Sequence, residues 1–424
     1  MTGRYKAYAE YKDSGVEWVG SIPTHWGLKK LKYLAPLIGE KATEKTNPIA
    51  LEHIQSWTGK LISSDSTFEG DGTKFKAGDI LFGKLRPYLA KVYLTKADGE
   101  AIGDFHVMRP ISNSYGKFLK SLMLTKDYIA TVDASTYGAK MPRASWDFTS
   151  NIQLPFCSEV EAEKIANFLD HETSKIDTLI DKQEKLIELL KEKRQAVISH
   201  AVTKGLNPDV PMKDSGVEWL GDVPEHWEVL PTKRFFRLVA EPSTKNHGME
   251  LLSVYAAIGV APRKDLEQKG NKASNTDGYW SVKKGDIIVN KLLAWMGAVG
   301  YSDYDGVTSP AYDILRKTKD INPKFYHFLF RQEFTQSEFK RWSRGIMEMR
   351  LRLYFEELGR IMMPVPPKNE QDKIVAEIES MNATFVKIED KATKQIELMK
   401  ERKTALISAA VTGKIDVRDW QESA

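Results

Sequence analysis

The sequence predicts an α+β protein made of two copies of one unit, in which two α/β domains are separated by two long helices. The first observation is a phrase that occurs twice. KDSGVEWVGSIPTHW at residues 12–26 returns as KDSGVEWLGDVPEHW at residues 213–227, with eleven of fifteen positions identical. The second is that each copy ends in a long stretch whose apolar residues keep heptad spacing. Together they predict a pseudo-twofold, circular fold whose long helices pair as an antiparallel coiled coil.

The repeat extends over the whole chain. KAGDILFGKLRPYLAKVYL, which begins at Lys76, aligns with KKGDIIVNKLLAWMGAVGY, which begins at Lys283, 207 residues later. The same offset pairs Arg143 with Arg350, and the closing stretches ISHAVTKG and ISAAVTGK match at an offset of 209. The regions between the opening phrase and the closing helix diverge. This pattern indicates domains that face different ligands, or else relaxed drift in a structural domain.

The first long helix is predicted from about residue 158 to residue 204 and the second from about 369 to 412. Ser158 and Glu161 have capping-box spacing, and Gly205 stands where a left-handed residue would end the first helix. Each helix would be roughly 67 Å long at 1.5 Å per residue and carries an apolar stripe, so the other copy is its expected partner. Packing of each helix on its own domain remains the alternative; a membrane-lying helix is disfavoured because the polar faces mix Glu and Lys. The predicted coiled-coil contacts are Leu169, Ile176, Leu179, Leu186, Leu190, Val197, Ile378, Phe385, Met399 and Leu406.

The regions before these helices contain short apolar stretches such as DILFGKL and DIIVNKLL, punctuated by Gly and Asp and followed by helical stretches. Each region is therefore predicted to be an α/β domain of about 130 residues. The predicted segments are an N-terminal segment at 1–27, the first α/β domain at 28–157, the central long helix at 158–205, a linker repeat at 206–227, the second α/β domain at 228–366, and the C-terminal long helix with its tail at 367–424.

Composition excludes several classes of protein. The net charge of +4 and the pI near 8.7 are compatible with nucleic-acid binding without requiring it. A single cysteine, Cys157, excludes a disulfide framework and a zinc cluster. No apolar run reaches the ~18–20 residues that a membrane span needs, and the first residues have no secretory pattern. We expect a cytoplasmic protein.

Motifs for catalysis are absent from the sequence. No G-x-G-x-x-G opens a predicted helix and no phosphate-binding P-loop occurs. The eight histidines are scattered singly, so they lack metal-ligand spacing. SPAY at residues 309–312 has one proline where the amino-methyltransferase tetrapeptide has two, and no glycine-rich cofactor loop precedes it. The sequence therefore predicts a binding protein rather than an enzyme, with no cofactor of its own.

Basic residues interleaved with aromatic ones mark both α/β domains. Lys and Arg neutralise phosphates, and Arg can bond two acceptors of guanine at once. A basic residue kept in both copies, as at Lys84 and Lys291, suits a phosphate contact, whereas one that differs, as Arg86 against Leu293, suits base reading. Ordinary surface charge is the alternative for any one of them. The candidate DNA-binding residues are Lys84, Arg86, Tyr88, Lys91, Tyr137, Lys140, Arg143, Lys291, Trp295, Arg341, Arg344, Arg350 and Arg352.

Four passages resemble one known family. They are KDSGVEWVGSIPTHW, GLNPDVPMKDSGVEWLGDVPEHW, GAKMPRASWDFTSNIQLPFCSEVEAEKIANFL and LMKERKTALISAAVTGKIDVR. In amino-acid sequence and in order along the chain they closely resemble the specificity (S) subunit of type I restriction-modification enzymes, and the resemblance covers essentially the whole chain.

The resemblance implies that each α/β domain is a target-recognition domain that reads one half of a split DNA site through the major groove. It implies that the helices form a spacer, and that two methyltransferase subunits dock on the chain and methylate adenine with S-adenosylmethionine. Two restriction subunits, which use ATP and Mg, would join for cleavage. The chain itself would be a non-catalytic specificity subunit.

A second class of function stays open: a scaffold that presents two divergent protein-binding domains on a coiled coil. Salt dependence separates the two, because duplex binding through several phosphates releases counterions. Pseudo-symmetry makes one further prediction. Residues 12–26 should pack near the end of the second long helix, around residues 412–417, so that the two ends of the chain lie close together.

Overall fold

The computed structural model describes residues 5–42, 46–63, 72–138, 140–245, 248–265, 276–347 and 350–421. It divides into two compact units, here called the first unit (Met1–Glu184 with Thr393–Ala424) and the second unit (Lys185–Ala392). The predicted segments follow the repeat, whereas the compact units divide both long helices, because each helix half packs on the domain beside it.

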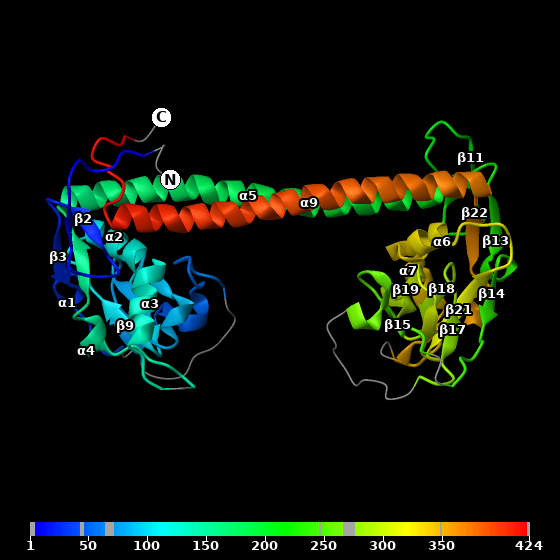
Figure 1. The fold of residues 1–424 in the computed structure, drawn as a ribbon, viewed down its shortest axis with the longest axis horizontal. Helices are drawn as coiled ribbons and strands as arrows, with labels where there is room; N and C mark the ends of the chain where they lie inside the picture. Colours follow the sequence, from blue (N-terminus) through cyan, green and yellow to red (C-terminus); the bar gives the residue numbers. More distant parts are fainter. Residues whose placement is uncertain are drawn as a thin grey trace. The chain divides into compact units, whose positions relative to one another are not determined.

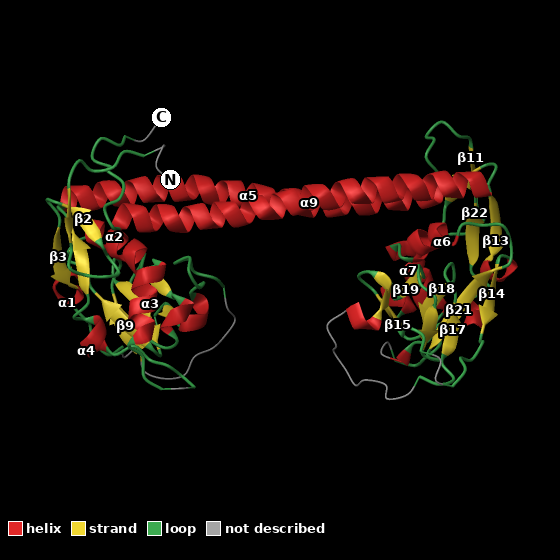
Figure 2. Cartoon of the chain, viewed as in Figure 1, coloured by secondary structure: helices red, strands yellow, loops and turns green. Residues whose placement is uncertain are grey.

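The two long helices are α5 (Glu159–Lys204) and α9 (Lys368–Val411) (Figure 1). In the first unit Lys403 contacts Asp177 at 2.6 Å and Lys400 contacts Glu184 at 3.8 Å. Residue numbers therefore decrease along α9 as they increase along α5. In the second unit the Arg194 Nε donates to the Asn382 Oδ1 at 2.8 Å. The helices are antiparallel, and the predicted fold class of mixed α/β domains with a coiled coil is confirmed (Figure 2).

The seam of α5 needs a correction. Leu169 and Ile176 are buried as expected, and Leu190 is half-buried. Leu179 and Leu186, however, are 49% and 40% exposed, and Val197 is 36% exposed. The more covered row falls one residue later in each case: Ile180 and Ile198 are buried, and Ile187 is half-buried.

A physical reason lies in the spacing. Contacts recur at 176, 180, 183, 187, 190 and 194, alternating four and three residues as a coiled coil requires. On a helix with 3.6 residues per turn, a residue one position earlier points about 100° away from the seam. Leu179, Leu186 and Val197 therefore lie on the exposed flank. On α9 the predicted positions lie on the seam: Ile378, Phe385 and Leu406 are buried and Met399 is half-buried.

The α/β domain of the first unit begins and ends on one antiparallel pair, β3 with β10. Behind it lie the sheet β7-β6-β9 and the sheet β4-β8-β5. Ser112 and Thr125 cap α2 and α3 by accepting hydrogen bonds from the first turn of each helix. The elements are β1 (Tyr11–Asp13), β2 (Ser21–Pro23), β3 (Gly27–Lys30), α1 (Leu31–Leu34), β4 (Pro48–Ile49), β5 (Gly72–Phe75), β6 (Ile80–Gly83), β7 (Val92–Leu94), β8 (Gly99–Ile102), β9 (Phe105–Met108), α2 (Asn113–Met123), α3 (Lys126–Ala134), α4 (Trp146–Thr149) and β10 (Gln153–Phe156).

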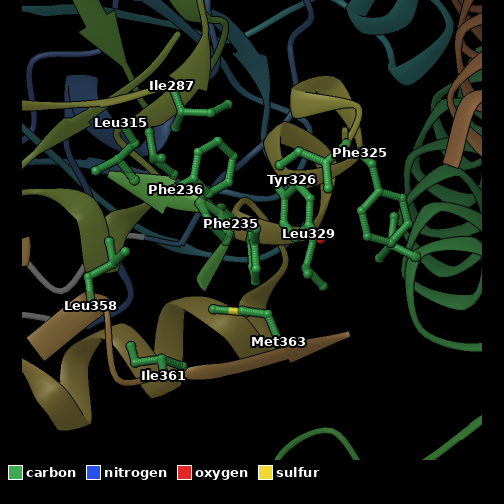
Figure 3. Packing of buried hydrophobic residues seen from close by; sticks show 14 of the residues in the cluster. Phe235, Phe236, Ile287, Leu315, Phe325, Tyr326, Leu329, Leu358, Ile361 and Met363 are labelled. Carbon is green, nitrogen blue, oxygen red and sulfur yellow. The ribbon is translucent and has the colours of Figure 1, made fainter. Parts of the chain in front are cut away.

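The second unit repeats this plan with a larger central sheet, β14-β21-β18-β19. Its core is aromatic: Phe235 stacks on Tyr326 with ring centroids 4.7 Å apart, and Phe236 packs edge-on to the same ring (Figure 3). The elements are β11 (Met212–Asp214), β12 (Asp222–Pro224), β13 (Glu228–Pro231), β14 (Phe236–Val239), β15 (Leu252–Tyr255), β16 (Gly259–Pro262), β17 (Trp280–Val282), β18 (Ile287–Asn290), β19 (Val299–Tyr301), β20 (Gly306–Thr308), β21 (Tyr312–Lys317), α6 (Pro323–Phe330), α7 (Glu333–Trp342), α8 (Phe355–Leu358) and β22 (Met362–Val365).

Ion pairs at matching positions show that the two units are built alike. Arg109 contacts Asp79 at 2.8 Å, and Arg316, 207 residues later, contacts Asp286 at the same distance. The hydrogen bonds that each guanidinium donates to its carboxylate raise the pKa of both arginines. A second matched set joins each domain to its long helix, through Lys117–Asp170 in the first unit and Lys324–Glu379 in the second.

The repeated phrase closes the chain on itself. In the first unit Lys414 donates to the carbonyl oxygen of Ser21, and a Cβ on Gly413 would lie 2.4 Å from Pro23. In the second unit Lys204 donates to the carbonyl of Asp222. Further along, the backbone N–H of Asp416 bonds the carbonyl oxygen of Lys6 at 2.8 Å. The predicted contact between residues 12–26 and residues 412–417 is confirmed. The second copy of the repeated phrase follows the first long helix in the chain, and the first copy packs against the end of the second long helix. The fold is circular in this sense.

Candidate nucleic-acid interface

In the first unit the predicted basic residues gather on the turns at one end of β6 and β9. Asp104, which precedes β9, lies 3.7 Å from the Lys84 ammonium and 2.9 Å from the Arg143 guanidinium. The hydrogen bond to Asp104 raises the pKa of Arg143. The backbone N–H of Ala144 donates to the carbonyl of Lys84 at 2.8 Å, which ties the two loops together. One carboxylate therefore orients two cations from distant parts of the sequence.

Beside this pair, four predicted residues point outward. Arg86 has a left-handed backbone (φ 51°) and its N–H bonds Pro142, so its exposed side chain is carried on a tight turn. Tyr88 and Tyr137 are 45% and 64% exposed, and Lys140 is exposed. Aromatic rings and cations on one surface are the side chains that stack on or bond to bases and phosphates.

Lys91 has a different environment from these. Its ammonium donates to the carbonyl oxygen of Leu51 at 2.6 Å, and burial lowers its pKa. The side chain is half-buried and holds the segment around Leu51 against the end of β6. The structure therefore gives Lys91 an internal contact.

In the second unit Lys291 takes the place of Lys84. Its ammonium lies 3.4 Å from Asp313 and donates to the carbonyl of Pro310 at 2.9 Å. Burial raises the pKa of Asp313, while the nearby Lys291 opposes that shift. The N–H of Leu353 donates to the carbonyl of Lys291 at 2.9 Å, as Ala144 does to Lys84. The two lysines thus share a role in joining two loops.

This match corrects the alignment of the arginines. Arg143 bridges Tyr137, and the same bridge in the second unit joins Arg344 to Arg352. The counterpart of Arg143 is therefore Arg352, 209 residues later, and not Arg350. The second loop is two residues longer, and constant spacing from the glycines missed the insertion.

The remaining candidates differ in how they are held. The side chains of Arg344 and Arg341 are both 69% exposed; the Arg344 guanidinium pairs with the buried Glu357, and that of Arg341 lies 3.7 Å from Glu338. Trp295 is half-buried and donates to the carbonyl of Leu292, so it is part of the domain's packing. Within the described ranges the exposed side chains of Arg350 and Arg352 have no carboxylate partner.

Apolar side chains at the tips of these loops were missed by the sequence analysis. Ile346 is fully exposed and Met347 is 58% exposed, between Arg344 and Arg350. Met141 is 50% exposed on the matching loop of the first unit. The sequence signal for these residues was the apolar pair between arginines in RGIMEMR. Apolar side chains in so charged a segment do not join a core, and exposed apolar side chains of this kind mark binding surfaces.

Three further observations concern metal binding, membrane spans and the lone cysteine. Over the described ranges, no cluster of His, Cys, Asp and Glu side chains has an arrangement that could hold a metal ion. No helix among the same residues is long and apolar enough to cross a membrane. Burial raises the pKa of the Cys157 thiol, which keeps it protonated.

The family model of the type I restriction modification DNA specificity domain matches residues 225–398. This match to the second α/β domain and most of α9 confirms the resemblance to type I restriction-modification specificity subunits that the repeated passages predicted.

Among its relatives is the putative type I restriction enzyme MjaX specificity subunit of Methanocaldococcus jannaschii, 22% identical over 94% of this chain and 96% of that one. Two solved structures share the fold. A chain from work on complex assembly and conformational transition of the type I R-M system has a TM-score of 0.70 at 16% identity, covering 93% of this chain and 99% of that chain. The HsdS subunit from Thermoanaerobacter tengcongensis has a TM-score of 0.58 at 15% identity, covering 93% and 98%.

Proposed function

We propose that this specificity subunit reads a bipartite DNA site, one half with each α/β domain. The observation that carries the proposal is the recurrence of one arrangement in two divergent domains. A lysine after the central strand (Lys84, Lys291) bonds a second basic loop through its carbonyl oxygen, and arginines from that loop face outward. Shared cations suit the uniform phosphate backbone, and unshared ones suit two different half-sites.

Arg86 is the strongest candidate for base reading in the first domain. Its left-handed turn projects the guanidinium outward, and no described carboxylate pairs with it. An unpaired guanidinium can bond the O6 and N7 of guanine together in the major groove. Lys84 and Arg143, held by Asp104, keep fixed positions that suit phosphates.

Partner subunits would supply the chemistry. Two methyltransferase subunits would dock on the chain and methylate adenine with S-adenosylmethionine, and two restriction subunits would use ATP and Mg for cleavage. This chain would bind none of these cofactors, would not be catalytic and would act in the cytoplasm. The support is the name shared by its relatives, the type I specificity subunits.

Methylome sequencing of cells that carry the chain with its partner subunits tests the proposal. The expected result is adenine methylation at a site with two specified halves and an unspecified spacer of constant length. Replacing residues 28–157 with the corresponding domain of another specificity subunit should change one half only. A methylation pattern unaffected by that exchange would contradict the proposal.

The scaffold alternative makes an opposite prediction about salt. Affinity of the assembled complex for a specific duplex should fall steeply between low and moderate salt, because each neutralised phosphate releases counterions. A scaffold that contacts only proteins would show no such duplex binding at any salt concentration.

A further inference from the structure

A polar pocket in the second unit lies between the long helices and the α/β domain. Its volume is about 620 Å³. The walls come from α5, from Asn382 on α9, from the α6–α7 junction and from the turn between β15 and β16. The charged and polar groups that matter are Lys191, Arg194, His327 and Arg331. None of its lining residues belongs to the outward loops proposed to contact bases.

The lining contains three cationic side chains and no carboxylate. Among the described residues, Arg194 bonds only the neutral Asn382, and the exposed Lys191 forms no ion pair. Burial lowers the pKa of Arg331, whose guanidinium donates to backbone carbonyl oxygens, including Ala256 at 2.6 Å and Gly297 at 3.1 Å. Positive charge here is therefore hydrogen-bonded but not neutralised.

The first unit shows the same place with its charge balanced. The counterparts of Lys191 and Arg194, 209 residues later, are Lys400 and Lys403. Lys400 lies 3.8 Å from Glu184. Lys403 lies 2.6 Å from Asp177, which also pairs with Lys60 of the domain at 3.0 Å.

The second copy of this arrangement has both cations but neither acid. The residues of α9 that correspond to Glu184 and Asp177 are Thr393, which belongs to the first unit, and Val386. Val386 is 43% exposed, and it stands one helical turn from Asn382, the residue that Arg194 does reach. The carboxylate that neutralises the first site is thus missing from the second, while the donors remain.

A neutral donor completes the wall. The Nδ1 of His327 accepts from the N–H of Tyr301 at 3.2 Å, so the proton of the ring is assigned to Nε2. Burial, with Arg331 and Lys324 nearby, lowers the pKa of His327 to about 3, so the ring stays neutral at physiological pH. A guanidinium, an ammonium and an imidazole N–H around one space are the donors that bind tetrahedral oxyanions.

We propose that this pocket binds a phosphate-type oxyanion, which takes the place of the carboxylate of Asp177 in the first unit. Arg194 and Lys191 supply the charge, and His327 supplies a neutral hydrogen bond. The volume exceeds that of a bare phosphate, so a phosphate ester also fits. The bound anion would join α5 to the domain of the second unit, as Asp177 joins α5 to Lys60 in the first.

Titration of the full-length chain with inorganic phosphate, at constant ionic strength kept with chloride, tests the proposal. Calorimetry and thermal unfolding should both show one saturable site. Arg194→Gln and Lys191→Gln should each lower the affinity for phosphate about tenfold or more, the cost of a lost charge-assisted hydrogen bond. Lys403→Gln, the matched control in the first unit, should leave phosphate binding unchanged.

Val386→Asp restores the carboxylate that the second unit lacks. This variant should unfold at a higher temperature than wild type without phosphate, and should lose the response to phosphate. The proposal is overturned if wild type shows no saturable site, if Arg194→Gln binds phosphate as wild type does, or if Val386→Asp retains the full response.

The phosphate group has two possible sources, a free anion and the DNA backbone. Repeating the titration with saturating specific duplex separates them. Duplex that removes the phosphate response, together with weaker duplex binding by Arg194→Gln, identifies a backbone phosphate; an unchanged response identifies a free anion. The site is tested on the chain alone, so its failure is distinguishable from failure of the proposed DNA recognition.

Discussion

At the scale of single residues, Arg86 illustrates how backbone geometry selects a functional side chain. A non-glycine residue with a left-handed backbone is uncommon and costs energy. Here the φ of 51° follows the end of β6 and aims the guanidinium away from the domain. The residue two positions after the shared lysine differs between the copies (Arg86 and Leu293), and this is the position from which two domains would read different bases.

We predict that Arg86→Ala in the assembled complex weakens discrimination at one base pair of one half-site by about 1–3 kcal/mol, the worth of a bidentate arginine–guanine pair. Duplexes with single substitutions through both half-sites measure this effect. Lys91→Ala is the control, since Lys91 bonds Leu51 inside the domain. Equal loss across all positions of both half-sites would assign Arg86 to phosphates instead.

Ile346 makes a separate prediction for the second domain. A fully exposed apolar side chain between arginines suits contact with a thymine methyl group in the major groove. Ile346→Ala should therefore weaken binding to the half-site of the second domain, and uracil in place of thymine should weaken wild type but not the variant. If uracil affects both proteins equally, Ile346 does not contact the methyl group.

At the scale of elements, the coiled coil was predicted correctly as a structure, but some of its contact positions on α5 were wrong. Heptad spacing correctly predicted the two helices and the four coiled-coil contacts expected on α9, and pseudo-symmetry predicted that the helices pair antiparallel. On α5 it selected Leu179 and Leu186, although Ile180 and Ile187 occupy the seam. Several neighbouring residues are apolar there, so the sequence allows two adjacent stripes, and the partner helix decides which is covered.

The seam predicts a difference between two adjacent residues. Ile180→Ala should destabilise the chain by about 2–5 kcal/mol, because it removes a buried side chain that is only 7% exposed. Leu179→Ala, at 49% exposure, should cost much less. Thermal and urea unfolding of the two variants measure the contrast. Equal destabilisation would place both residues in contact with another element.

The length of α5 makes a second prediction at this scale. Seven residues of helix correspond to about 10 Å, or about three base pairs of duplex. Deleting one heptad from α5 should keep both recognised half-sites and shorten the spacer between them. Methylome sequencing of the deletion variant with its partner subunits reads the spacer directly. An unchanged spacer would reject a role of the helices in setting it.

At the scale of the whole molecule, the repeated phrase makes the chain circular. The first unit contains residues from both ends of the sequence, and Lys6 contacts Asp419 across 413 positions. Buried side chains of the phrase complete this joint: Trp26 is 1% exposed, as Trp227 is fully buried in the second unit. The place in the first unit where the two ends of the chain meet thus corresponds to the linker at residues 206–211 in the second unit.

Circularity predicts that the break can be moved. A permutant that joins the two ends with a short linker and opens the chain between residues 206 and 211 should fold and unfold at a midpoint close to that of wild type. Opening the chain within α5 is the control, since it cuts a continuous helix in the middle of the coiled coil. Similar stability for both permutants would mean that the closure contributes little to folding.

The sequence by itself determined the repeat, the helices and the resemblance to type I specificity subunits, because duplicated passages and heptad spacing survive as local patterns. It also predicted that the ends of the chain meet, since symmetry carries one junction onto the other. Only the tertiary structure decided the register of the α5 seam, the match of Arg143 with Arg352, and the shared carboxylate at Asp104. These depend on which residues distant in sequence come into contact. The change of repeat offset from 207 to 209 shows that two residues are inserted but not where, and a one-residue rotation of a helix leaves no mark on composition.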